Sequence, residues 1–124
     1  MTADFTGLIS LIRIYATPDG ESHMEDVAIA QGASIPATAV IANAYRPSTV
    51  SWHPAPRPQF AINMTGVLEA EVSTGTKRRI GPGELVFLHD TFGKGHITRL
   101  IDPVTNLFIR VPEDFDVLAW ARGE

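Results

Sequence analysis

The chain has 124 residues and a formal net charge of -4, and its scattered basic residues exclude the broad basic face of a nucleic-acid binder. Its content of 44% hydrophobic and 19% charged residues is that of an ordinary globular protein, so we expect a single domain over residues 1–124. Cysteine is absent, which excludes disulfides, thiolate metal sites and cysteine nucleophiles.

The hydropathy of the chain indicates the expected location of the protein in the cell. No run of about 18 apolar residues occurs, and the chain opens with Met1-Thr2-Ala3-Asp4-Phe5 rather than with a basic segment. We therefore expect a soluble, cytoplasmic protein whose partner is a small molecule. Neither nucleic acid nor a membrane is an expected partner.

Two strands are predicted in the N-terminal part of the chain. Residues 8–16, LISLIRIYA, are rich in leucine and isoleucine and predict a strand. Residues 17–23, TPDGESH, contain a proline and an Asp-Gly pair and predict a loop, and the acidic residues as far as Asp26 indicate a solvated segment. Residues 37–45, ATAVIANAY, mix β-branched residues and a tyrosine and predict the second strand.

The clearest pattern begins at Phe60. Apolar and polar residues alternate over 60–65 and again over 68–72, which predicts two half-buried strands. Glycine turns and shorter apolar runs follow, and they predict an exposed strand in TKRRI, a buried strand at 84–88, a loop at 90–96 and a strand at 105–111. The tail, 113–124, predicts a short closing helix. Many short strands separated by such turns favour a β-sandwich or a closed barrel.

Residues 51–60, SWHPAPRPQF, place His53 before three prolines. Proline fixes φ and cannot donate a ladder hydrogen bond, so this segment is expected at a stiff edge, here a barrel mouth that presents His53 in one orientation. The alternative is a proline-rich edge that prevents aggregation, with His53 merely exposed beside it.

Two spacings within residues 52–100 resemble the motifs of the cupin superfamily. In the first, three residues separate the run His53-Pro54-Ala55 from Gln59, and six more separate Gln59 from Gly66. In the second, Gly83 precedes a hydrophobic strand and a loop that leads to His96 and is two residues longer than the family's. The sequence departs from the family pattern at Pro47, Ala55, Gln59, His89 and Leu100, which stand where the family has Gly, His, Glu, Pro and Asn.

The resemblance implies an all-β protein, a double-stranded β-helix or cupin jelly-roll barrel of the RmlC-like kind, and the pattern of the tail adds a short C-terminal helix. Within the single domain we expect an N-terminal strand and arm at about 1–36, a barrel core at about 37–112 and the tail at 113–124. The resemblance also implies a homodimer, with residues 8–16 as the candidate for strand exchange.

The resemblance carries over His53 and His96 as ligands of a divalent metal, Mn, Fe or Zn, with Gln59 as a neutral third ligand. One imidazole and the carboxylate of the family's site are missing here, so a metal-free site is the equal alternative. In that alternative the two histidines face each other over the cavity and act as general base and acid, because imidazole changes its protonation near neutral pH. Asp90 is the candidate to orient one of the rings.

Further residues are candidates for the same site. Arg57 joins His53, His96 and Gln59 among the catalytic candidates, because its charge would hold an anionic end of the substrate. The remaining candidates are expected to bind the substrate: His23, Lys94, Tyr45 and Arg99.

These residues together predict a small-molecule enzyme, a lyase or isomerase that moves protons on a carbonyl or carboxylate compound in the barrel pocket. One alternative is a metal-dependent dioxygenase that uses His53, Gln59 and His96. Another is a cupin that binds a small ligand without catalysis. A structural cupin, its pocket filled by apolar side chains, is the third.

Overall fold

The structure is a computed structural model that describes residues 9–124, and the elements in this part of the chain are nearly all strands. They are β1 (Ser10–Ala16), β2 (Ser22–Ala28), β3 (Ala39–Tyr45), β4 (Ser48–His53), β5 (Gln59–Thr65), β6 (Leu68–Val72), β7 (Lys77–Ile80), β8 (Leu85–His89), β9 (His96–Leu100), β10 (Val104–Arg110) and the helix α1 (Val117–Ala121).

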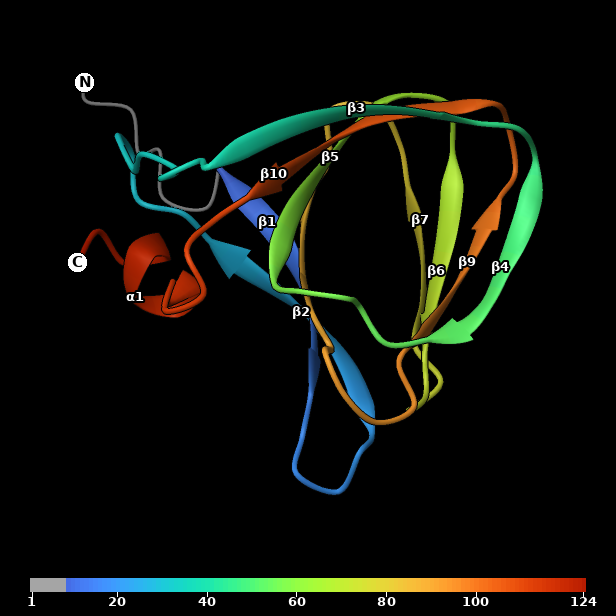
Figure 1. Ribbon diagram of the computed structural model, residues 1–124, viewed down its shortest axis with the longest axis horizontal. Helices are drawn as coiled ribbons and strands as arrows, with labels where there is room; N and C mark the ends of the chain where they lie inside the picture. Colours follow the sequence, from blue (N-terminus) through green and yellow to red (C-terminus); the bar gives the residue numbers. More distant parts are fainter. Residues whose placement is uncertain (1–8) are drawn as a thin grey trace, which may run out of the picture.

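The strands form two sheets that face each other and curve around a common interior (Figure 1). One sheet has six strands in the order β2-β1-β8-β5-β10-β3, and the other has four in the order β4-β9-β6-β7. Neighbouring strands are antiparallel except for β1 and β8, which pair in parallel. This arrangement is a jelly-roll barrel, so the predicted all-β fold is confirmed.

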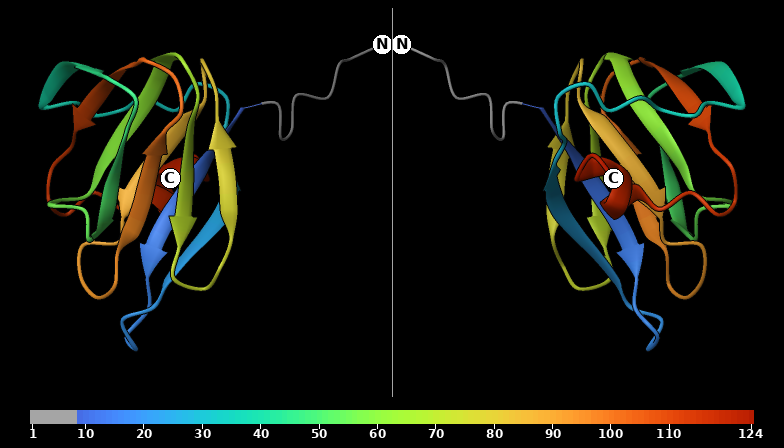
Figure 2. Two further views of the ribbon diagram at one scale, coloured as in Figure 1. Left: turned by 90° about the vertical axis from the view of Figure 1, so that its right-hand side faces the viewer. Right: turned by 90° about the vertical axis from the view of Figure 1, so that its left-hand side faces the viewer.

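The six-stranded sheet has an apolar layer on each of its faces. Along β8, Val86 and Leu88 point into the barrel, whereas Phe87 points outward and is fully buried in an aromatic cluster. Phe60 meets Phe87 in that cluster, with ring centroids 4.8 Å apart, and Trp120 of α1 covers Phe60 at 5.2 Å. Figure 2 shows α1 lying against this outer face, outside the barrel.

Several strand predictions are confirmed, but three strands, β2, β4 and β9, were missed. The alternating segments form β5 and β6, and the tail contains the predicted short helix. The segment that begins at Ser22 was predicted to be a solvated loop, but it forms the edge strand β2. Its carboxylates form ion pairs across the surface, Glu25 with Arg13 at 2.9 Å and Asp26 with Arg78 at 2.5 Å, which is why the acidic residues suit an edge strand.

The N-terminal segment contributes to the barrel itself. The predicted strand 8–16 is observed from Ser10 as β1, which lies between β2 and β8 of the same chain, while residues 1–8 lie outside the described residues. Over residues 9–124, no helix is both long enough and apolar enough to cross a membrane.

Candidate functional site

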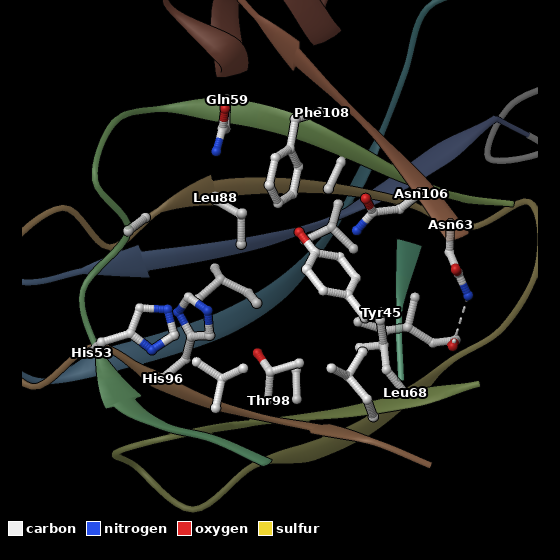
Figure 3. Close-up of a pocket in the computed structure, with 18 of the residues that line it drawn as sticks. Tyr45, His53, Gln59, Asn63, Leu68, Leu88, His96, Thr98, Asn106 and Phe108 are labelled. Carbon is white, nitrogen blue, oxygen red and sulfur yellow. Dashed lines mark hydrogen bonds between the residues drawn. The ribbon is translucent and has the colours of Figure 1, made fainter. Parts of the chain in front are cut away.

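The two sheets enclose a cavity of about 490 Å³ (Figure 3). A cavity of this size is typical of sites for small organic ligands, which occupy pockets of about 300–1,000 Å³. The polar residues that line it are Tyr45, His53, Gln59, Asn63, His96, Thr98 and Asn106, and the apolar ones are Ile14, Val50, Pro54, Ala55, Pro56, Ala61, Leu68, Ala70, Ile80, Val86, Leu88, Leu100 and Phe108.

His53 and His96 lie side by side at one end of this cavity (Figure 3). His53 ends β4, His96 begins β9, and the two residues are cross-strand partners in the four-stranded sheet. Their ring centroids are 4.9 Å apart and their planes are inclined at 51°. The prediction that the rings converge on one cavity is therefore met, but they stand on the same wall and do not face each other across the interior.

Gly95 makes this pairing sterically feasible. Its φ is +71°, and a Cβ at this position would lie 2.1 Å from the carbonyl carbon and oxygen of His53. Only glycine lets the backbone before His96 pass so close to the end of β4. The preceding loop is fixed from the other side, because the backbone N–H of Lys94 donates to Gly20 O (2.9 Å) and the Ser22 hydroxyl donates to Gly95 O (2.6 Å).

The Nδ1 atoms of both imidazoles are held by acceptors. His53 Nδ1 lies 2.7 Å from the backbone oxygen of Ser51, and His96 Nδ1 lies 2.5 Å from Oδ2 of Asp90. A carbonyl and a carboxylate both accept, so we place the hydrogen of each ring on Nδ1. Neither Nε2 atom has a hydrogen-bond partner among residues 9–124, and both are left for a bound molecule.

Asp90 is the buried partner of this pair, as the sequence predicted for an orienting carboxylate. It is 0% exposed and follows directly after β8, and its backbone oxygen accepts the N–H of Ala55 at 2.9 Å. Its second carboxylate oxygen has no partner in the described part of the chain. The first oxygen therefore fixes the orientation and tautomer of the His96 ring.

Gln59 and Tyr45 reach the same cavity from the six-stranded sheet. Gln59 is 5% exposed, and its amide has no hydrogen-bond partner among residues 9–124 and points into the cavity (Figure 3). A loop separates His53 from Gln59, and the two residues lie on opposite sheets. The hydroxyl of Tyr45 points toward the middle of the cavity, and burial raises the pKa of this phenol.

Four predicted residues are not brought to this cavity. Arg99 pairs with Glu69 (3.0 Å) and Glu71 (2.9 Å), and these hydrogen bonds raise its pKa. The other three also lie elsewhere: Lys94 pairs with Glu21, His23 stacks on Tyr15 with ring centroids 5.3 Å apart, and Arg57 lines a separate hollow beyond Pro56. Long cationic side chains next to acidic residues form surface pairs, and the sequence alone did not reveal those neighbours.

Two asparagines of the cavity were missed from the sequence. Asn63 donates to the backbone oxygens of Gly66 (2.8 Å) and Ile80 (3.2 Å), and Asn106 accepts from Asn43 at 3.1 Å. Both are less than 9% exposed, although strand interiors disfavour asparagine. An asparagine at an inward position of a predicted strand was the available signal.

The donor atoms of the cavity do not fit a resident divalent metal. No group of three His, Cys, Asp or Glu side chains within residues 9–124 is placed to hold one. The lining offers two imidazoles on one wall and a neutral amide on the opposite sheet, and Asp90 already binds His96. Catalytic Zn, Fe and Mn sites normally include a third strong ligand, often a carboxylate.

Comparison with known proteins supports the fold. No family model and no curated protein matches the chain. Among solved structures, it is similar to protein NMB1881 from Neisseria meningitidis, with 12% identity over 84% of each chain and a TM-score of 0.50. It is also similar to a Salmonella typhimurium LT2 protein described as ethanolamine utilization protein Q, with 10% identity, 86% of this chain and 98% of that chain covered, and a TM-score of 0.48.

At sequence identities this low, structural similarity is evidence about the fold alone. Together with the two sheets and their strand order, the likeness to NMB1881 identifies the fold as the cupin-type jelly-roll barrel, as the resemblance in the sequence predicted.

Proposed function

We propose that this protein is an enzyme that moves a proton on a carbonyl compound bound in the cavity, as an isomerase or a lyase. The observation that supports this most is the adjacent imidazole rings of His53 and His96, each of which has its Nδ1 held by an acceptor. Two neighbouring imidazoles can accept and return one proton, which is the chemistry that both reaction classes require.

His96 is the proposed general base. Its Nε2 removes a proton from the carbon next to the substrate carbonyl, and the C–H electron pair becomes the double bond of an enolate. The buried carboxylate of Asp90 stabilises the imidazolium that forms. Gln59 or Tyr45 donates a hydrogen bond to the enolate oxygen, since both have polar groups free in the cavity.

His53 completes the proposed reaction. The proton taken by His96 first passes to the free Nε2 of His53, directly or through water; the ring centroids are 4.9 Å apart. His53 then gives this proton either to another carbon of the enolate, which is an isomerisation, or to a departing hydroxyl group, which leaves as water in an elimination. No proton is gained or lost in the isomerisation.

Deuterium exchange tests this proposal without knowledge of the natural substrate. In D2O, the protein is expected to accelerate loss of the α-hydrogen NMR signals of 2-tetralone, an uncharged ketone, beyond the rate with an equal concentration of free imidazole. His53→Gln and His96→Gln should each lower the enzymatic rate by about 10²- to 10⁴-fold. His23→Gln, outside the cavity, is the matched control and should leave the rate unchanged.

The same samples separate the two rival functions. Oxygen consumption with the ketone that stops in EDTA and returns with iron, together with about one metal ion per chain by elemental analysis, would favour the metal-dependent dioxygenase. Ligand binding by the wild-type protein without any acceleration of exchange would favour a non-catalytic binding protein.

A further inference from the structure

The part of the chain that the structure describes, residues 9–124, places no Asp, Glu, Lys or Arg side chain on the wall of the cavity. This is unusual for a site that takes a carboxylate or a phosphate, because such anions are normally held by Arg, Lys or a cluster of backbone N–H groups.

The cationic side chains near the cavity are directed elsewhere. Arg99 and Lys94 form ion pairs with glutamates outside the barrel, and Arg57 lines the separate hollow beyond Pro56. The nearest buried charge behind the cavity wall is the carboxylate of Asp90, which would repel an anion bound beside His96. An anionic ligand would therefore lose its hydration without gaining a partner of opposite charge.

Polar side chains lie at both ends of the cavity and between them (Figure 3). His53 and His96 lie at one end, and Asn106 lies toward the other, with no partner for its Nδ2 among residues 9–124. Between them the wall combines the apolar side chains of Leu88 and Phe108 with the hydroxyl groups of Tyr45 and Thr98.

We infer that the substrate is an uncharged, mainly apolar ring compound, with the reacting carbonyl at the histidine end and a second hydroxyl or carbonyl group at the Asn106 end. The cavity of about 490 Å³ has room for two or three fused rings. This inference rests on the proposed function, because it names the substrate class of the same site. It replaces the expectation that Arg57 would hold an anionic end of the substrate.

Binding of an isosteric pair tests the inference. The probes are 6-hydroxy-2-naphthamide and 6-hydroxy-2-naphthoate, which have the same shape and differ in charge, and their fluorescence reports binding to the wild-type protein at about pH 8, where free imidazole is neutral. The amide is expected to bind about tenfold more tightly or better. Equal or tighter binding of the carboxylate, or no binding of the amide, would overturn the inference.

The second part of the binding experiment places a positive charge at the rim of the cavity. Val50 lines the cavity and is 42% exposed, so the protein should tolerate Val50→Lys there. This change should raise the affinity for the carboxylate by about tenfold and leave the amide affinity unchanged. Val40→Lys is the matched control, because Val40 is also an exposed strand valine, 58% exposed, but does not line the cavity. Equal effects of the two lysines would place binding outside the cavity and contradict the inference.

Failure of this inference and failure of the proposed function have different signatures. If the protein prefers the amide but does not accelerate ketone exchange, the inference of an uncharged ligand stands and the proposed catalytic function is wrong. If the protein accelerates ketone exchange but prefers the carboxylate, the proposed catalytic function stands and the inference of an uncharged substrate is wrong.

Discussion

His53 and His96 differ in the acceptor that holds the Nδ1 atom. For His53 it is the neutral backbone oxygen of Ser51, and for His96 it is the carboxylate of Asp90. A carboxylate stabilises an imidazolium more than a carbonyl does, because the interaction is between opposite charges. For this reason, the reaction that we propose uses His96 as the base and His53 as the returning acid.

Asp90→Asn should change the tautomer of His96. An amide at position 90 can present an N–H to the ring, so Nδ1 would no longer need to carry the hydrogen. Ketone exchange should fall by about 10²-fold or more. The ¹⁵N chemical shifts of the His96 ring should also show a mixture of tautomers, which a loss of stability alone would not cause. Unchanged ¹⁵N shifts and an unchanged rate would contradict the positioning role of Asp90.

His89 predicts how stability depends on pH. Burial is the main cause that lowers its pKa from the ordinary value of 6.5, and the nearby charge of Arg13 adds to the effect. The unfolded chain therefore takes up a proton at a higher pH than the folded chain does. The free energy of unfolding should be constant with respect to this group above about pH 7 and should fall as the pH drops through 6.5.

Urea unfolding of the wild type and of His89→Gln at a series of pH values measures this contribution. The variant should lose less stability than the wild type between about pH 7 and pH 5. Parallel curves for the two proteins would show that His89 is not the group responsible.

At the scale of elements, alternation of apolar and polar residues predicted strands well and irregular segments poorly. β5 and β6 alternate regularly and were predicted nearly to their ends. β4 was missed because five of its six residues are exposed, so no apolar face marks it in the sequence. β2 was missed because ion pairs with other strands, rather than an apolar pattern, stabilise its acidic residues.

Glycine substitutions test how β9 is placed against β4. Gly95→Ala should strain the backbone by about 1–2 kcal/mol and add about 1–3 kcal/mol of overpacking, because the new Cβ would overlap the carbonyl of His53. Gly75→Ala is the matched control, with φ at +99° but open space around its Cβ, and should cost only the strain. Denaturant unfolding measures both.

Ketone exchange by the two glycine variants adds a functional comparison. Gly95→Ala should lose exchange activity because the imidazoles separate, whereas Gly75→Ala should retain it. Equal losses of stability and activity in the two variants would show that the close approach at Gly95 is unimportant.

For the whole molecule, the outer aromatic cluster explains how the barrel can keep a cavity. Phe60 and Phe87 are 0% exposed on the outer face of the six-stranded sheet, where Trp120 of α1 covers Phe60. A second cluster, which includes Ile12 and Val72, packs between the sheets, and some of its members, such as Ile14 and Ala70, also line the cavity. Stability therefore does not require the interior to be filled.

Two phenylalanine substitutions compare how much the outer aromatic cluster and the cavity wall each contribute to stability. Phe60→Ala should lower the free energy of unfolding by about 3–5 kcal/mol, since it removes the centre of the outer cluster. Phe108→Ala should cost about half of that or less, because this side chain already faces the cavity on one side. Urea unfolding measures both, and a larger cost at Phe108 would contradict the division into an outer core and an open interior.

The sequence predicted the candidate site in part. Motif spacing correctly brought His53, Gln59 and His96 to one cavity, because spacing within a known fold constrains which positions point inward. It could not show that Arg99 and Lys94 turn toward glutamates on other strands. Those neighbours depend on strand order, which a local pattern does not contain.

The measurement that tests the account most directly is α-hydrogen exchange of 2-tetralone by His53→Gln, His96→Gln and the double variant. If the two imidazoles work as one unit on a bound ketone, each single variant should lose nearly as much activity as the double variant, because either loss interrupts the same proton transfer. Exchange at the wild-type rate in the double variant would contradict the account.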